Sequence, residues 1–350
     1  MNYEIWSTYP PPFGGVTIHT YRLFNYLKDN ESFNVIFRTH TKKNPSTKNI
    51  LQWNYLNSLF ILYKNRKTSL FHFHSQNLFF WFFISLLPFR INYFITIHNV
   101  DIHLIKNYLQ LKMTRLYLIR SQKILINDKK LCEYLVSEFN LNANKLLKIE
   151  AYIPPNESEY DTLENKIHAF RDKVDVLISG NAFKLMLDVN KQDLYGVDIS
   201  IDLISRLRAN GYNAGLIFVI PLIEDLNYFN YLNNKIKGYK LDEYILFIRS
   251  GLKNAFQIWS ISDIFIRPTS TDIEGISIKE AMFFGVKCIA SNVCERPNGT
   301  FIFKNRNLDD FYKKVCEALV SDKKVKYDNI ETVKVIEKLI INYMSINNVK

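Results

Sequence analysis

The chain has 350 residues, of which 47% are apolar and 23% are charged, and its formal net charge is +11. This length suffices for two domains with full cores, and the composition is that of a folded protein rather than a disordered one. The four cysteines form no C-x-x-C pair, and the chain does not begin with the pattern of a secretion signal. We therefore expect a cytoplasmic protein with reduced cysteines.

The excess of positive charge suggests an anionic partner. Lysine and arginine are dense in the first half of the chain, and residues 102–126 combine them with apolar residues at helix-like spacing. Such a helix could lie on the anionic inner face of the cell membrane, or it could be a core-facing helix with a solvated basic face. The apolar run 78–89 is too short to span a membrane and predicts a buried helix. No nucleic-acid motif accompanies the charge, so we do not expect a nucleic-acid partner.

The first 27 residues predict a strand, a loop and a helix. Residues 3–6 predict a short strand, the loop contains three prolines followed by Gly14 and Gly15, and apolar residues then recur at helical spacing. Paired glycines let the backbone turn and approach a ligand closely. At the first strand-to-helix junction of a Rossmann-like domain, Gly14 and Gly15 are candidates for a loop that faces phosphate.

Short apolar strands then alternate with helical patterns, which predicts a parallel sheet flanked by helices. The strands are expected at residues 35–37, 70–73, 93–97, 124–126 and 147–149. Four histidines lie at or near strand ends: His72, His74, His98 and His103. Imidazole is a common zinc ligand, but no cysteine or carboxylate at ligand spacing joins them. His98 follows its strand where an α/β domain exposes its crevice, which makes it a candidate to position or react with a ligand.

Around residues 152–155 the strand pattern stops, and a polar stretch follows at 156–165. The proline pair and the polar composition predict a linker that lets two domains close on a ligand. We place a first domain at 1–160 and a second at 166–329. An apolar face on residues 330–350 predicts that this last helix packs back on the first domain.

The second domain begins with a strand at 175–178, a predicted turn at Gly180, and Lys184. A strand, a glycine turn and a cation are typical of an anion-facing loop. Further strands are expected at 216–220, 245–248 and 301–303, and a helix at 309–320.

The most informative stretch runs from 263 to 293 and predicts strand, loop, helix and strand. The backbone N–H groups of Gly275, Ile276 and Ser277 would point out of the helix start, which is a place for phosphate. Asp272 and Glu280 bracket this point with seven residues between them. Carboxylates accept hydrogen bonds from paired hydroxyls, so the spacing suits a sugar beside an anion site. Alternatively, the acids are turn and helix-start residues placed by propensity alone.

This pattern resembles the signature of retaining glycosyltransferases of family four, which have the GT-B fold. The likeness rests on the acid, seven residues and Glu280, on the Ala-Met, Gly and apolar strand that follow, and on the amino-terminal Gly-Gly loop. It implies two Rossmann-like domains facing across a cleft, with the last helix crossing back. In that family the first acid contacts the transferred sugar and the second holds the ribose, which implies these roles for Asp272 and Glu280.

The resemblance also implies that His98 faces the donor sugar and that Lys184 stands for a diphosphate-binding arginine. Two positions depart from the family pattern. The first acid is usually Glu, so Glu274 competes with Asp272. Tyr195 stands before Gly196 where a second cation is usual, and Lys191 or Arg267 would have to replace it.

The resemblance implies transfer of a sugar from a UDP- or GDP-linked donor to a capsular, exopolysaccharide or lipopolysaccharide chain, with retention. The acceptor would be a glycan or lipid-linked glycan at the membrane. Because a helix start and cations can stabilise the diphosphate, we expect no metal and no cofactor. Two alternatives remain: a metal-dependent hydrolase using His72, His74, His98 and His103, and an inactive protein that binds nucleotide-sugar.

Overall fold

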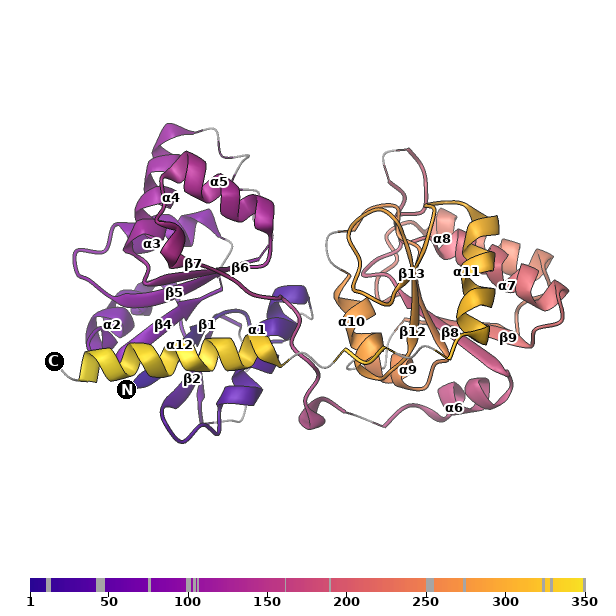
Figure 1. Cartoon of the computed structure of the whole chain (residues 1–350), viewed down its shortest axis with the longest axis horizontal. Coiled ribbons are helices and arrows are strands. Elements are labelled where there is room, and N and C mark those ends of the chain that lie inside the picture. The colour runs from indigo at the N-terminus through magenta and orange to yellow at the C-terminus, as the bar shows by residue number, and fades with distance from the viewer. Residues whose placement is uncertain are drawn as a thin grey trace. The chain divides into compact units, whose positions relative to one another are not determined.

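A computed structural model describes residues 1–10, 14–41, 48–74, 77–98, 102, 105, 107–160, 162–188, 190–249, 255–272, 275–322, 325–327 and 330–348. The chain divides into two compact units (Figure 1). Unit 1 comprises Met1–Asn156 and Asn329–Lys350, and unit 2 comprises Glu157–Asp328. Among the described residues, no helix is both long and apolar enough to cross a membrane.

Unit 1 is built on a seven-stranded sheet in the order β3-β2-β1-β4-β5-β6-β7, and every strand pair in it is parallel. The strands are β1 Asn2–Trp6, β2 Asn34–Thr39, β3 Ile50–Gln52, β4 Ser69–Phe73, β5 Asn92–Ile97, β6 Lys123–Ile126 and β7 Leu146–Lys148. The helices are α1 Gly15–Leu27, α2 Tyr55–Asn65, α3 Leu78–Ser85, α4 Tyr108–Arg120, α5 Lys129–Phe139 and α12 Glu331–Asn348.

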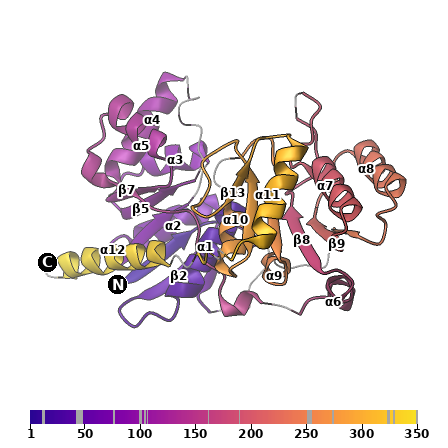
Figure 2. The ribbon, with the colours of Figure 1, turned by 45° about the vertical axis from the view of Figure 1, so that its right-hand side comes forward.

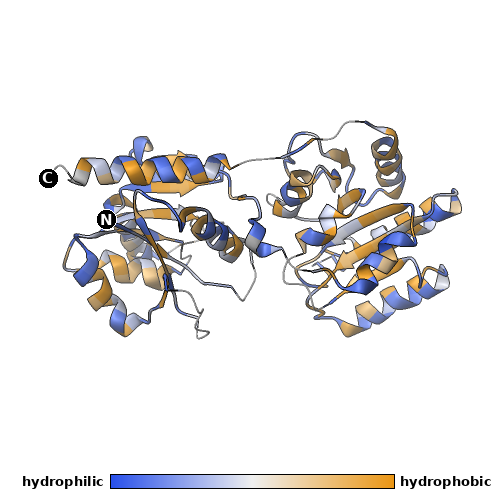
Figure 3. Ribbon diagram, turned by 90° about the horizontal axis from the view of Figure 1, so that it is seen from below, coloured by the Kyte–Doolittle hydropathy of each residue, from blue (hydrophilic) through white to orange (hydrophobic). Residues whose placement is uncertain are grey.

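The two faces of this sheet carry separate cores, because successive side chains of a strand point to opposite faces. In β1, Trp6 belongs to the core under α2 to α5, whereas Tyr3 and Ile5 belong to the core with α1 and α12. Apolar and polar residues alternate along α12 (Figure 3). Its buried residues Ile336 and Ile340 join the second core, which confirms that the last helix packs on the first domain.

Unit 2 contains a six-stranded parallel sheet in the order β10-β9-β8-β11-β12-β13. The strands are β8 Val176–Asn181, β9 Ala214–Val219, β10 Ile245–Ile248, β11 Ile264–Arg267, β12 Lys287–Ser291 and β13 Phe301–Phe303. The helices are α6 Asn165–Asp172, α7 Val197–Ala209, α8 Leu226–Gly238, α9 Phe256–Ser260, α10 Ile276–Phe283 and α11 Leu308–Val320. Figure 2 shows α7 and α8 side by side. The predicted α/β fold with two parallel sheets is confirmed.

The strand order reverses direction at one point in each sheet. In unit 1 the chain proceeds outward from β1 on one side and from β4 on the other, and in unit 2 it does so from β8 and from β11. At such a switch point the neighbouring connections leave on opposite faces, and ligands bind at the carboxyl ends of the strands. His74 and Arg267 lie at these two points.

Two local predictions are wrong. Gly180 lies inside β8 rather than in a turn. Glycine is needed there because a Cβ would approach the Phe218 ring to 2.8 Å. Residues 102–126 do not form one amphipathic helix. The helix begins at Tyr108, which is 79% exposed, and ends at Arg120 before β6. The strand β3 was not predicted, since it has only three residues.

A glycine is required at the start of α7, which gives a first prediction. Gly196 has a φ of +69°, and a Cβ there would lie 2.3 Å from the carbonyl oxygen of Pro268. Gly211 also has positive φ, but its surroundings are open. Gly211→Ala should therefore cost about 1 kcal/mol of unfolding free energy through backbone strain. Gly196→Ala should cost at least about 2 kcal/mol more, because it adds overlap. Urea denaturation measures both, and equal losses would contradict the overlap.

Candidate functional site

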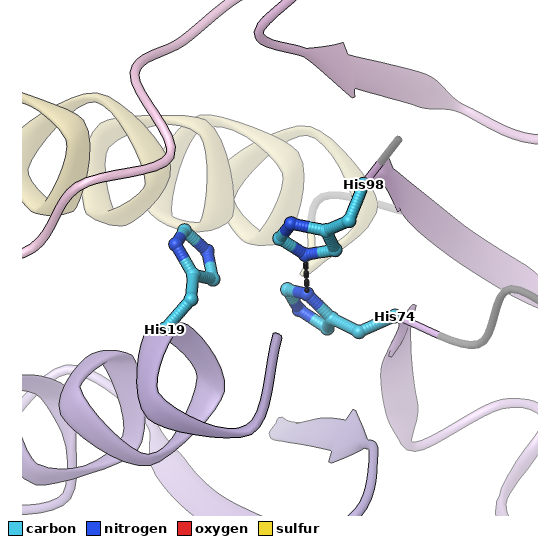
Figure 4. Close-up of side chains that lie close together, drawn as sticks. All are labelled: His19, His74 and His98. Atoms are coloured by element: carbon cyan, nitrogen blue, oxygen red, sulfur yellow. Dashed lines mark hydrogen bonds between the residues drawn. The ribbon is translucent and has the colours of Figure 1, made fainter. Parts of the chain in front are cut away.

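Three buried histidines meet at the carboxyl edge of the unit 1 sheet (Figure 4). His19 lies in the first turns of α1, His74 follows β4, and His98 follows β5. The His74 Nδ1 and His98 Nε2 atoms are 3.1 Å apart, and the rings of His19 and His98 have centroids 4.8 Å apart. Among the described residues these three form the group that could hold a metal ion, with one nitrogen of each within 4.8 Å of the others.

Burial keeps two histidines of this edge, His74 and His98, neutral. Burial lowers the pKa of His74 and of His98 well below the usual range, and the neighbouring histidines lower it further. His19 donates its Nδ1 proton to the Ala151 carbonyl oxygen at 2.6 Å, which fixes its tautomer. A neutral imidazole offers one lone pair, so His74 and His98 can each accept a hydrogen bond or ligate a metal.

His72 does not join this group. Its Nδ1 is hydrogen-bonded to the Tyr3 hydroxyl, and its Nε2 is 2.8 Å from the Thr96 hydroxyl oxygen. His72 is therefore a core residue with both ring nitrogens satisfied. His103 lies outside the described residues. Sequence reasoning missed His19, although its place one turn after Gly15 on the helix that follows the glycine loop was a usable signal.

The two glycines at the end of the predicted loop lie at the start of α1. Gly14 is the N-cap of α1 with extended backbone, and both Gly14 and Gly15 are exposed. The Gly14 N–H donates to the Thr17 hydroxyl oxygen at 2.8 Å. Among the described residues, the nearest atom that a Cβ at Gly14 would meet is 3.9 Å away.

In unit 2, Asp272 is bound by two arginines. Its Oδ2 atom lies 3.0 Å from Arg267 Nε and 2.7 Å from Arg296 Nη1. Arg267 closes β11 and also donates to Asn181 Oδ1 at 3.2 Å, at the end of the neighbouring β8. The Arg296 side chain is 0% exposed. Sequence reasoning missed Arg296, because it belongs to the loop after the next strand.

These contacts settle the charge of Asp272. Burial by itself would raise the pKa of its carboxyl, but the charges and hydrogen bonds of Arg267 and Arg296 hold the pKa below its usual value. Asp272 is therefore a carboxylate, and the three groups together carry a net positive charge at the carboxyl end of β11.

The start of α10 lies against this cluster. Gly275 is its N-cap with a φ of +67°, and a Cβ there would approach Arg296 Nη1 to 2.9 Å. Ser277 is buried, and its hydroxyl has no hydrogen-bond partner in the described part of the chain. Ile276 and Ser277 follow in the first turn, and Glu280 lies half-buried one turn later. Glu274 lies outside the described residues.

The start of α7 is already occupied. Asp193, which sequence reasoning missed, accepts hydrogen bonds from the backbone N–H groups of Gly196 and Val197 at 3.0 Å each. Burial is the main reason that its pKa rises to about 6. The chain's own carboxylate thus satisfies the start of α7, whereas at the start of α10 the nearby carboxylate of Asp272 is bound by Arg267 and Arg296.

The other positions where a cation was predicted do not join the cluster around Asp272. Lys184 forms an ion pair with Glu224 at 3.0 Å, so it does not add net charge by itself. Tyr195, in the place of the usual second cation, has its ring 5.5 Å from the Arg267 guanidinium. Lys191 is exposed.

Two parallel Rossmann-like sheets, with a last helix that returns to the first unit, are the architecture of the GT-B glycosyltransferases. The chain is similar to HepE of Anabaena in complex with UDP, with a TM-score of 0.64, 12% identity and coverage of 100% of this chain and 99% of that one. It is similar to a glycosyltransferase of Rickettsia africae, with a TM-score of 0.67, 16% identity and 98% of each chain covered.

A third similar structure is WaaG, described as a glycosyltransferase involved in lipopolysaccharide biosynthesis, with a TM-score of 0.57, 14% identity and coverage of 92% and 91%. No protein-family model matches the chain, and neither does any curated protein. At these identities the likeness establishes the GT-B fold.

The buried ion pairs of Asp272 give a second prediction. Asp272→Asn leaves the Arg296 guanidinium buried without its carboxylate, which should cost about 3 kcal/mol of unfolding free energy. The matched control is Asp309→Asn, because Asp309 pairs with Arg206 but is 86% exposed, and it should cost far less. Urea denaturation compares the two. If both variants lost a similar free energy of unfolding, the buried Arg296 guanidinium would not need the Asp272 carboxylate for stability.

The buried neutral histidines give a third prediction. Burial first, and the charge of His19 second, lower the pKa of His72 to about 3, whereas an unfolded histidine titrates near about 6.5. His72 therefore binds more protons in the unfolded chain than in the folded one. Its contribution to the free energy of unfolding is full above about pH 6.5 and falls by about 1.4 kcal/mol per pH unit below that pH.

In His72→Gln the free energy of unfolding should depend on pH less steeply, by about 1.4 kcal/mol per pH unit. His168→Gln, at an exposed position on α6, should leave this pH dependence unchanged. Urea denaturation between about pH 6.5 and pH 4 measures the slopes. An unchanged slope in His72→Gln would mean that this histidine is protonated in the folded chain.

Proposed function

We propose that this protein is a glycosyltransferase of family four that moves a sugar from a nucleotide-sugar donor to a growing surface glycan. The glycan would be a capsular, exopolysaccharide or lipopolysaccharide chain, and the reaction would proceed with retention and without a metal ion. The sequence signature around Glu280 and the GT-B fold of the similar structures support this proposal.

One observation carries the proposal: the start of α10 meets two arginines. Arg267 and Arg296 converge on Asp272 beside Gly275, and the buried Ser277 hydroxyl has no partner among the described residues. Backbone N–H groups, guanidinium groups and a hydroxyl are the donors that bind a diphosphate. We assign the donor diphosphate to this place, where it would be stabilised as it leaves.

The remaining donor-site residues take roles from the same geometry. Glu280 lies one turn along α10, and its carboxylate would accept hydrogen bonds from the ribose hydroxyls. Asp272 would contact the transferred sugar while it holds the two arginines in place. Lys184 is proposed as a further diphosphate contact, which it can make only by leaving Glu224.

His98 is proposed to position the transferred sugar or to act on it. It lies at the carboxyl edge of the unit 1 sheet and is hydrogen-bonded to His74. Because burial keeps its pKa low, His98 would act as a neutral hydrogen-bonding group rather than as a cation. Gly14 and Gly15 are proposed to line the same region of unit 1.

The donor nucleotide is proposed to be UDP or GDP. HepE was crystallised with UDP, with UDP and glucose, and with UDP-glucose, which supports UDP as the first choice. The acceptor is proposed to be a glycan or lipid-linked glycan at the inner face of the cell membrane. The charge of the three clustered groups makes a metal ion unnecessary for holding the diphosphate.

The proposal predicts that a nucleotide stabilises the protein in the presence of a chelator. We expect UDP, GDP or one of their sugar conjugates to raise the thermal unfolding temperature. At a concentration a hundredfold above Kd, binding adds about 2.7 kcal/mol. Glu280→Ala should remove the shift. The matched control is Glu243→Ala, since Glu243 is an exposed carboxylate that pairs with Lys173, and it should keep the shift.

The outcomes separate the alternatives. A shift that requires added metal would contradict the metal-independent site. No shift with any nucleotide would contradict the donor site itself. If a nucleotide-sugar binds but is neither transferred nor slowly hydrolysed, the protein is an inactive binding partner.

A second function is favoured by the cluster of His19, His74 and His98. Three imidazoles with an open position are the ligand set of catalytic zinc, so a metal-dependent hydrolase is the competing proposal. The ligands would be these three rather than the predicted set with His72. Stoichiometric bound zinc that is lost in His19→Ala would favour it.

A further inference from the structure

The outer side of α2 and α3 carries large apolar side chains that no described residue covers. On α2 they recur at the spacing of one helical face, and on α3 they do the same. We call this set the α2/α3 face, and it comprises Leu56, Leu59, Phe60, Tyr63, Phe79 and Leu86. Leu56 is 92% exposed, Phe60 66% and Phe79 63%. The sequence predicted a buried helix at 78–89, and this prediction is wrong for its outer side.

The two helices form one continuous surface. The Tyr55 ring of α2 lies 5.6 Å from Phe79 and 6.4 Å from Phe83 of α3, measured between centroids. Only Ser58 and Leu62 of α2 are buried, so most of the apolar residues of this helix point away from the core. A helix on the surface of a soluble domain normally exposes polar residues there. An apolar outer face of this kind marks a binding surface.

The charge of the same region has one sign. Residues 32–100 contain eight lysines and arginines and no aspartate or glutamate. Three of these cations lie at the end of α2 and just beyond it, namely Lys64, Arg66 and Lys67, and Arg90 follows α3. None of the four forms an ion pair with another described residue. Their charge is therefore available to an anionic partner.

A hollow of about 760 Å³ gathers three of these cations. It is lined by Met1, Asn2, Arg66, Lys67, Thr68, Arg90 and Asn92. The lining residues lie at the starts of β1, β4 and β5, so the hollow is at the amino edge of the sheet, opposite the histidine cluster. Tyr63 connects it to the α2/α3 face, because its ring lies 5.3 Å from Phe89 and 3.8 Å from the Arg66 guanidinium.

We propose that the α2/α3 face and the adjoining hollow dock this protein on an anionic lipid bilayer. The apolar side chains enter the boundary between headgroups and acyl chains, and the cations of the hollow bind the phosphates of the headgroups. Tyr55 and Tyr63 suit the same boundary, where amphipathic aromatic rings gather. The proposal does not rest on the proposed enzymatic function.

Charge favours a bilayer over a second copy of this chain. In a two-fold dimer the α2/α3 face would meet itself, which would bring the cations of one copy close to those of the other. A bilayer with anionic lipids offers apolar depth and negative charge at once. This surface is a different one from residues 102–126, for which the sequence allowed either a membrane-binding helix or a core-facing helix; the structure has α4 and β6 within that range.

The test is flotation of the full chain with vesicles of phosphatidylcholine alone and of phosphatidylcholine mixed with phosphatidylglycerol. We expect binding to the mixed vesicles that weakens as salt is added. Leu56→Gln/Phe60→Gln should abolish this binding. Lys67→Gln/Arg90→Gln should reduce it roughly tenfold or more, because each surface cation contributes about fivefold.

The matched control is Leu226→Gln/Val320→Gln, which replaces two exposed apolar residues of unit 2 and should bind vesicles like the unchanged protein. The replaced side chains are exposed, so all variants should keep the same thermal unfolding temperature. Equal binding of all variants, or no binding to either vesicle, would overturn the proposal. So would a dimer in solution that Leu56→Gln/Phe60→Gln dissociates, because the face would then belong to a second copy.

Discussion

Every strand pair in both sheets is parallel, and this constraint decides where the chemistry lies. All carboxyl ends of a parallel sheet meet at one edge, and each return connection crosses a face. The loops after β4 and β5 therefore bring His74 to His98, and the loops after β11 and β12 bring Asp272 to Arg296. Both pairs are 24 residues apart in the chain. That separation is one helix and the strand that follows it.

Electrostatics then gives two helix starts in unit 2 opposite roles. At α7 the buried carboxylate of Asp193 satisfies the backbone N–H groups, so this start has no need of an outside anion. At α10 the neighbouring carboxylate of Asp272 is turned to Arg267 and Arg296 instead. Two guanidiniums outweigh one carboxylate, and the positive end of the helix dipole adds to them. The start of α7 is thus satisfied by the chain itself, whereas the start of α10 is the one for which we propose that it binds an anion.

The two edges of the unit 1 sheet also differ in charge. At the carboxyl edge burial keeps His74 and His98 neutral, which suits hydrogen bonding to an uncharged group such as a sugar. At the amino edge Arg66, Lys67 and Arg90 line an open hollow beside an apolar face. Binding of lipid phosphate and binding of a sugar would therefore take place at opposite edges of one sheet and need not compete.

The sequence by itself determined the parallel α/β architecture, the return of α12 and the place of the α10 start, because these follow from local periodicity, glycines and caps. It could not place His19 or Arg296 beside their partners, since those contacts join segments that follow different strands. Gly180 was misread for a related reason: the need for glycine comes from Phe218 on the adjacent strand, not from a turn. Tertiary structure decided which apolar residues of α2 and α3 remain outside, because periodicity does not say which side of a largely apolar helix meets the core.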